Sequence, residues 1–245
     1  MMKADYLNGI RVRGREMNRV EFLSDAVFGF ALTLLVVSLE IPQSFADLQN
    51  AMMHAPAFAC SLLAFGFIWH CHYRFFRQFG LETNGTMWLN GVMLFLILLF
   101  VYPLKYLSTV LISFLVMHKA LGIPIEFYIS ISLADAPALH IIYSLGFGAI
   151  FFCLTLFYVL ARHNADALDL DASERLAVTG HIWAYGVVVA VALISTFLVI
   201  VCPPAWQLPA AGFVYWLIWP IEVIIGRHFA GREKRLLSVD QATSS

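Results

Sequence analysis

The fold class is decided by the stretch Arg19-Val-Glu-Phe-Leu-Ser-Asp25-Ala-Val-Phe-Gly-Phe30-Ala-Leu-Thr33-Leu-Leu-Val-Val37. Its charged residues stand in the first two turns, and an apolar run without a glycine–proline break follows. Crossing the hydrocarbon region of a bilayer takes roughly 20 predominantly apolar residues. The stretch therefore predicts a membrane-spanning helix over residues 22–41, with its polar start at the membrane interface.

Five further windows on the C-terminal side have the same apolar character, namely 54–75, 86–115, 139–161, 177–202 and 205–228. The whole chain is 61% hydrophobic and 13% charged, whereas a soluble domain has about half apolar and a quarter charged residues. We therefore expect an all-α, polytopic integral membrane protein, with residues 1–245 forming a single six-span membrane domain. Tyr102-Pro103 predicts a kink in the third span, because proline lacks a backbone donor.

The basic residues are placed asymmetrically along this six-span pattern. All of the 15 Lys and Arg residues except Lys105 and Lys119 fall in the N-terminal segment, the second and fourth loops, or the tail. Cytoplasmic loops of membrane proteins carry an excess of Lys and Arg. We expect both termini on the cytoplasmic side of the cell inner membrane, and Asp171 or Ser173 as the N-cap of the fifth span.

Several function classes are excluded or disfavoured. The net charge of −1 and pI of 6.7 indicate no nucleic-acid partner. No nucleophile motif or glycine-rich phosphate loop occurs, and neither Ser195 nor Ser108 has an evident histidine companion, so no enzyme activity and no cofactor are expected. Disulfides and zinc are not indicated by the spacing of the cysteines, which are Cys60, Cys71, Cys153 and Cys202.

Ionisable residues at membrane depth are candidates for function, because burying a charge in a bilayer is costly. His70 and His72 in the second span point about 200° apart on a helix and cannot share one metal ion. His72 could instead hydrogen-bond to Asp25 of the first span. That pair leaves open a proton-coupled or small-solute transporter, and a membrane scaffold without transport activity is a third possibility.

Phe30, Thr33, Leu34 and Val37 share one face of the first span by the i, i+3, i+4, i+7 rule. Considered alone, such a stripe is more typical of helix–helix packing than of a pore. The Thr33 hydroxyl could simply donate back to the carbonyl of Gly29.

Three short motifs, in order, resemble the transmembrane-protein-175 family of potassium channels, its prokaryotic branch in particular. The family motif R-x-x-x-F-S-D stands here as Arg19, Leu23, Ser24 and Asp25, with leucine in place of phenylalanine. The other two motifs comprise Trp69, His72, Arg74 and Phe76 in the second span, then Trp88, Asn90, Tyr102 and Pro103 in the third. The resemblance covers the first half of the chain, and the second half only by its number of spans.

This resemblance implies a potassium-permeable channel that lacks a selectivity-filter loop, and no T-V-G-Y-G-like segment is present. A single copy of the motif implies a homotetramer whose pore is lined by the first span. The hydrophobic constriction would fall at Phe30, where the family has an aliphatic residue, with a ring of Thr33 hydroxyls for transient potassium contact and with Leu34 and Val37 above it. The implied polar network between spans 1 and 2 consists of Arg19, Ser24, Asp25, Trp69 and His72.

Overall fold

The computed structural model of the protein describes residues 6–7, 9–14, 16–37, 43–112 and 135–243. Within them, five helical stretches are each long and apolar enough to cross a membrane. They are α3 (Ala55–Phe79), α4 (Asn84–Ile112), α6 (Ala136–His163), α7 (Ala172–Val201) and the stretch Gln207–Arg232. The prediction of an all-α, multi-pass membrane fold is confirmed.

The sixth predicted span corresponds to α1 (Arg19–Val37), a helix of 19 residues. Arg19, Glu21 and Asp25 charge its first two turns, and α1 is not among the five strongly apolar stretches. Its length is close to the roughly 20 residues that a span needs. The sixth crossing remains a prediction, and the predicted end of this span at residue 41 lies outside the described residues.

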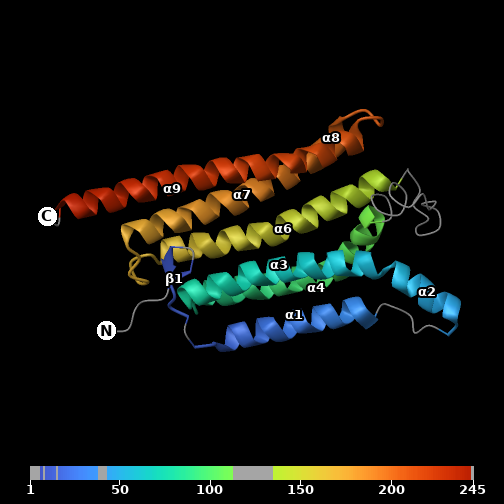
Figure 1. The fold of residues 1–245 in the computed structure, drawn as a ribbon, viewed down its shortest axis with the longest axis horizontal. Coiled ribbons are helices and arrows are strands. Elements are labelled where there is room, and N and C mark those ends of the chain that lie inside the picture. The colour runs from blue at the N-terminus through green and yellow to red at the C-terminus, as the bar shows by residue number, and fades with distance from the viewer. Residues whose placement is uncertain (1–5, 8, 15, 38–42, 113–134, 244–245) are drawn as a thin grey trace.

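The helices run roughly side by side along the long axis of the molecule (Figure 1). Figure 1 places α1 at one edge, α3 and α4 next to it, then α6 and α7, and α9 (Ile218–Thr243) at the opposite edge. A short helix, α2 (Phe45–Met53), precedes α3 and lies at the end of the bundle opposite β1. The N-terminal strand β1 (Tyr6–Leu7) and the last turns of α9 lie at the same end of the bundle.

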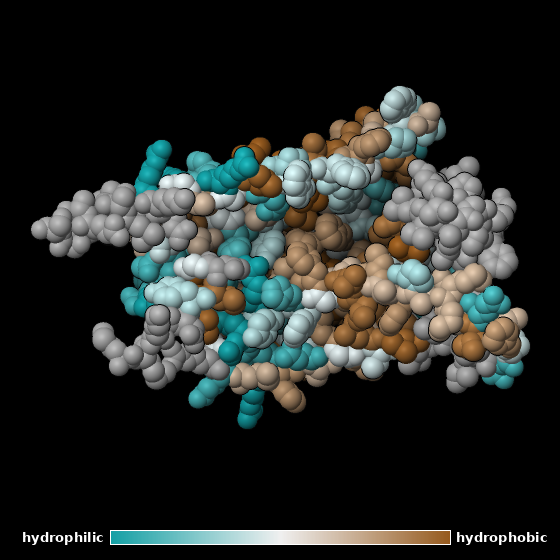
Figure 2. Space-filling view, viewed as in Figure 1, coloured by the Kyte–Doolittle hydropathy of each residue, from teal (hydrophilic) through white to brown (hydrophobic). Residues whose placement is uncertain are grey.

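Hydropathy follows this axis. Figure 2 shows hydrophilic residues gathered mainly at the end that holds β1, and hydrophobic residues over the middle of the bundle. Arg74 and Arg77, expected in a loop, belong to the last turns of α3 at that end. Arg162 ends α6 and Arg175 begins α7 there as well. The basic residues of these helices therefore share one end, as the asymmetry in the sequence predicts.

Two helix boundaries differ from the sequence-based windows. The last predicted span, 205–228, consists of α8 (Gln207–Val214), the 3-10 turn η3 (Tyr215–Leu217) and α9, and α9 continues to Thr243. The third span begins at Asn84 and continues as helix through Pro103 to Ile112, while its predicted end at 115 falls outside the described residues. Asp171 is the N-cap of α7, as expected, and forms a reciprocal capping box with Glu174.

The core is dominated by aromatic rings where α3 meets α6. Phe75, Phe76, Phe157 and Tyr158 have no exposed surface, and the Phe75 and Phe157 ring centroids are 4.8 Å apart. Within this cluster the Tyr158 hydroxyl donates to Gln78 at 2.9 Å, which satisfies two buried polar groups at once. All four cysteines are free, and Cys71 and Cys153 are buried.

A small antiparallel hairpin, β1 with β2 (Ile10–Arg11), precedes α1 and docks on the end of α3. Gly14 follows it, donates its N–H to the carbonyl of Arg77 at 3.2 Å, and accepts from the Arg77 guanidinium at 2.6 Å. A Cβ at Gly14 would overlap the carbonyl oxygen of Phe76. The segment can therefore approach α3 this closely only because residue 14 is glycine.

Gly14→Ala is expected to lower stability by about 2 kcal/mol, because the added methyl must push the hairpin off α3. The measurement is the thermal midpoint of the purified protein in detergent. Gly91→Ala is the matched control, since a Cβ there meets no atom within 4 Å and a mid-helix alanine is favourable by roughly 0.5–1 kcal/mol. Equal midpoints for the two variants would contradict the packing argument.

Candidate functional site

Two of the candidate pore residues, Phe30 and Thr33, lie on a face of α1 that the described part of the chain leaves uncovered. Phe22, Ala26, Phe30 and Thr33 are all exposed and recur at helical spacing. The opposite face is buried against the bundle through Ser24, Phe28, Ala31 and Leu35. One side of α1 is thus anchored, and the other presents a nearly apolar surface in which Thr33 supplies a hydroxyl.

The predicted pore residues divide into three groups. Phe30 is 59% exposed and Thr33 is exposed, so both lie on the uncovered face. Leu34 is only partly exposed, because it also packs against the core. The side chain of Val37 lies outside the described residues.

The Thr33 hydroxyl donates to the carbonyl oxygen of Phe30 at 2.6 Å, one residue later than the expected partner Gly29. Such back-bonding is common for threonine in helices, since it satisfies the hydroxyl hydrogen within the helix. The oxygen lone pairs then remain available to an acceptor-seeking ligand such as a cation. Thr33 can therefore present an oxygen to the space beside α1 without leaving its donor unpaired.

A buried cluster centred on Asn90 joins α1, α3 and α4. The Asn90 amide donates from Nδ2 to Ser24 Oγ at 3.0 Å, and Oδ1 lies 2.7 Å from His72 Nε2. A carbonyl oxygen can only accept, so His72 Nε2 carries the hydrogen. Each of the three residues is at most 2% exposed. The amide of Asn90 therefore joins three helices at a buried position. Asn90 was not among the predicted site residues.

Asp25 lies one step further out, at the edge of the same region. Its Oδ1 accepts from the Trp69 indole at 2.8 Å. The predicted hydrogen bond between Asp25 and His72 is not formed. His72 is hydrogen-bonded to Asn90 instead, and Asp25 accepts from Trp69. The sequence could not resolve this exchange of partners, since His72 and Trp69 stand within one turn on α3.

Arg19, the first residue of α1, is exposed, and its side chain forms no hydrogen bond or ion pair with the described residues of its own chain. The start of the helix is instead capped by Asn18 and Glu21. Glu21 N–H donates to Asn18 Oδ1 at 2.7 Å, and Asn18 N–H donates to Glu21 Oε2 at 3.2 Å. The role of Arg19 in a polar network stays a prediction.

A cavity of about 260 Å³ opens at this end between α1 and α3. Asp25 and His72 both line it, together with Met17, Glu21, Tyr73 and Arg77. Among the residues that the structure describes, no group of three or more His, Cys, Asp or Glu side chains is arranged to hold a metal ion. The cavity has a polar lining without a preformed metal centre.

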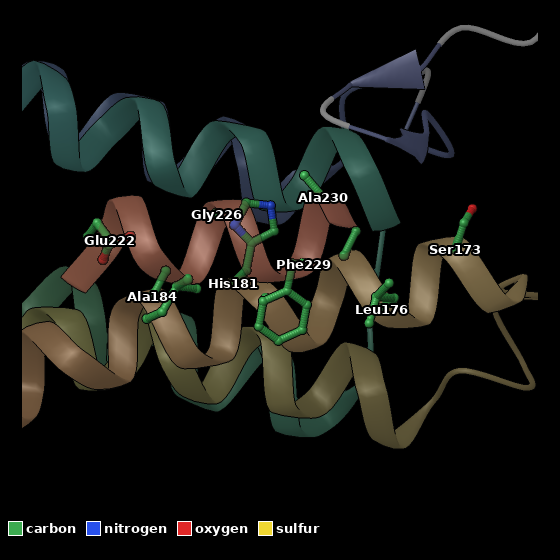
Figure 3. A pocket seen from close by; sticks show the side chains of 11 residues that line it. Ser173, Leu176, His181, Ala184, Glu222, Gly226, Phe229 and Ala230 are labelled. Carbon is green, nitrogen blue, oxygen red and sulfur yellow. The ribbon is translucent and has the colours of Figure 1, made fainter. Parts of the chain in front are cut away.

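A larger groove of about 430 Å³ lies between α7 and α9, at the edge of the bundle opposite α1 (Figure 3). Small residues of the two helices, such as Gly180 and Gly226, leave the space that Phe229 partly fills. Two ionisable side chains, those of His181 and Glu222, line the groove. Its position places this groove away from the uncovered face of α1.

The structure corrects one detail of the sequence analysis: Ser195 does have a histidine companion. The Ser195 hydroxyl donates to the carbonyl of Ala211 at 2.9 Å, and its oxygen lies 2.7 Å from His140 Nε2. A nucleophile must have its proton taken by the base. Here the serine proton is directed to a carbonyl, so the pair ties α6 to α7 and α8 and is not a hydrolytic dyad.

Comparison with known proteins points to one family. A family model described as "Endosomal/lysosomal potassium channel TMEM175" matches residues 19–101. A potassium channel of Marivirga tractuosa is 35% identical over 233 residues, which is 92% of this chain and 92% of the relative. A potassium channel of Streptomyces collinus is 30% identical over 101 residues, covering 38% of this chain and 48% of the relative. A similar solved structure is the crystal structure of the potassium channel MtTMEM175, a threonine-to-alanine variant in complex with a nanobody–MBP fusion protein. Its TM-score is 0.82 and its sequence identity is 32%, and the match covers 92% of this chain and 99% of that chain.

Proposed function

We propose that this chain, which belongs to the TMEM175 family of potassium channels, forms a homotetrameric pore lined by the uncovered face of α1. The single observation that carries the proposal is the division of α1 into an anchored face and an exposed face that includes Phe30 and Thr33. A closed rotational assembly brings the same face of each copy to the axis. The exposed stripe of α1 would then surround a common pathway.

In this arrangement Phe30 forms the constriction. Its phenyl ring is 59% exposed in one chain, so more than half of its surface is open to a neighbouring copy at the axis. A ring of apolar side chains impedes ions by excluding water from the narrowest point. The aromatic faces also offer a weak attraction to a dehydrated cation.

Thr33 lies about one turn further along α1 than Phe30 and presents its oxygen on the same face. Four such oxygens would partly replace the hydration shell of potassium, which is the task that rings of carbonyls perform in other channels. No T-V-G-Y-G-like segment occurs in the sequence to supply those carbonyls. Potassium contact at Thr33 would be transient, as conduction requires.

The end that holds β1, Arg74 and Arg175 is proposed to face the cytoplasm, since Lys and Arg accumulate on that side of membrane proteins. Residues 1–245 would then form one six-span domain in the inner membrane, with α1 as the sixth crossing. The transporter hypothesis loses its relay, because Asp25 and His72 are hydrogen-bonded to Trp69 and Asn90.

The test is flux through liposomes that hold the purified protein, with potassium, sodium and proton gradients imposed in turn. We expect potassium flux above sodium flux, and the Thr33→Val variant should reduce the potassium-to-sodium ratio about fivefold. That change corresponds to losing interactions worth about 1 kcal/mol, the scale of one hydrogen bond. Valine has a similar shape and the position is exposed, so protein yield and thermal midpoint should not change.

Two results would contradict this assignment. Saturating, proton-driven flux in the wild type would favour a transporter. An unchanged potassium-to-sodium ratio in Thr33→Val would remove Thr33 from the ion pathway. Cross-linking of the membrane-embedded protein should give species up to a tetramer, and a series that stops at two copies would contradict the fourfold pore.

A further inference from the structure

Glu174 binds Arg11 of strand β2 and Arg13, which follows the hairpin, although more than 150 residues of sequence separate them from Glu174. Arg13 donates from Nη2 to Glu174 Oε2 at 2.7 Å and from Nη1 to Oε1 at 2.9 Å. Arg11 donates its backbone N–H to Oε1 at 2.8 Å and its Nε at 3.3 Å. The Glu174 side chain has no exposed surface. Bidentate bonds between arginine and a buried carboxylate are among the stronger and more directional hydrogen bonds in proteins.

The turn before α7 is shaped to hold the same two guanidinium groups. The Leu168 carbonyl accepts from Arg13 Nε at 2.8 Å, and the Asp169 carbonyl accepts from Nη2 of Arg11 at 2.5 Å and of Arg13 at 3.1 Å. Asp169 adopts φ of +48°, a left-handed conformation that aspartate tolerates better than most residues. Hydrogen bonding to Glu174 raises the pKa of Arg11 above its usual value. The turn and Glu174 together form the binding site for Arg11 and Arg13.

The hairpin is also fixed by apolar and backbone contacts. Ile10 has no exposed surface and belongs to the main core cluster. Gln78 of α3 donates to the Leu7 carbonyl at 3.0 Å, and Arg13 N–H donates to the Gln78 carbonyl at 3.3 Å. Gly14 contacts the end of α3. The N-terminal segment is therefore attached to α3 and α7 as far as Gly14, where the linker to α1 begins.

The linker between Gly14 and the capped start of α1 is short, spanning residues 15–18. A short chain limits how far its two ends can separate, at most about 3.3–3.6 Å per residue. The position of the hairpin therefore restricts where α1 can begin. In the same way, moving the turn before α7 would move the start of α1.

We propose that Glu174 is a positioning residue for α1: by binding Arg11 and Arg13 it holds the start of the proposed pore helix at a fixed place beside α3. The inference rests on the proposed function, in which α1 lines the pore. Glu174 itself touches no part of the uncovered face of α1. It acts on the pathway through the hairpin, and loss of its charge loosens the first turns of α1.

The experiment uses full-length protein with Glu174→Gln. Glutamine still serves as the acceptor of the α7 capping box, but it loses the negative charge that the two arginines need. Amide hydrogen exchange in residues 17–25 is expected to be about tenfold faster, because opening of this segment costs less free energy. The potassium-to-sodium flux ratio should fall at least about twofold.

Asp166→Asn is the matched control. Asp166 lies in the same connection and pairs with Arg175 at 2.5 Å, but its side chain is 95% exposed and does not touch the hairpin. It should leave both exchange and selectivity unchanged. Arg13→Gln, which keeps Glu174 and the capping box, should reproduce the effect of Glu174→Gln, and the double variant should add little, since both act through one contact.

Faster exchange confined to the first turn of α7, with α1 unchanged, would overturn the proposal and leave Glu174 as a cap of α7. Additive effects of Arg13→Gln and Glu174→Gln on α1 exchange would overturn it as well. The exchange measurement does not depend on conduction. A wild-type protein without potassium flux whose α1 exchange still responds to Glu174→Gln would refute the pore and retain the positioning role.

Discussion

Phe30→Ala is expected to carry potassium about tenfold faster than the wild type. The ring is 59% exposed on the face of α1 that is proposed to line the pore, and alanine at each copy removes four phenyl groups from the constriction. A wider, more readily hydrated opening lowers the free-energy barrier, and a tenfold rate corresponds to about 1.4 kcal/mol. Potassium flux into liposomes under a fixed gradient measures the change directly.

Phe95→Ala provides the control, because Phe95 is 63% exposed on α4 and not on α1. The two substitutions remove the same group from a similarly exposed position, so a general effect on helix packing or protein insertion should appear in both. Faster flux in Phe30→Ala alone would support the constriction. If wild type and Phe30→Ala were both silent, or if Phe95→Ala raised flux equally, the constriction would not lie at Phe30.

Much of the helical scaffold could be predicted, because its cause is local. An apolar run long enough to cross the hydrocarbon region forces the backbone to pair internally as helix, whatever its neighbours are. The same holds for the capping box of α7, in which Asp171 and Glu174 stand three residues apart in the sequence. The break at Tyr215–Leu217 was missed, since nothing in the hydropathy of that stretch changes there.

The polar contacts were predicted less well, because each depends on which helices become neighbours. Asn90 was noted for a short motif, but nothing in the sequence says that its amide faces both Ser24 and His72. The burial of Glu174 under Arg11 and Arg13 likewise has no signal in the sequence, since the arginines lie more than 150 residues away along the chain. The clustering of charge at one end of the bundle could be predicted from the sequence. The hydrogen-bond and ion-pair partner of each residue could be identified only from the folded structure.

Asn90→Leu is expected to destabilise the protein by about 3 kcal/mol, without change to any residue on the uncovered face of α1. Leucine fills a similar volume but leaves the His72 ring N–H without its acceptor and Ser24 Oγ without its amide donor. An unsatisfied buried polar group costs about 1–3 kcal/mol. The thermal midpoint in detergent should fall clearly. The control is Thr109→Val on the same helix, because the Thr109 hydroxyl donates to the carbonyl of Lys105 within α4. This substitution should change stability by less than about 0.5 kcal/mol.

A double-mutant cycle separates the hydrogen bond from simple loss of packing. The His72 ring lies among Phe28, Phe76 and Phe157, with centroid distances of 5.7, 4.7 and 6.0 Å, so phenylalanine suits the position. In Asn90→Leu/His72→Phe, both partners of the bond are apolar and no donor is left unpaired between them. The double variant should therefore cost less than the sum of the single variants by about 1–2 kcal/mol. Strictly additive losses would show that Asn90 contributes through its shape, and that the bond to His72 does not hold α1, α3 and α4 together.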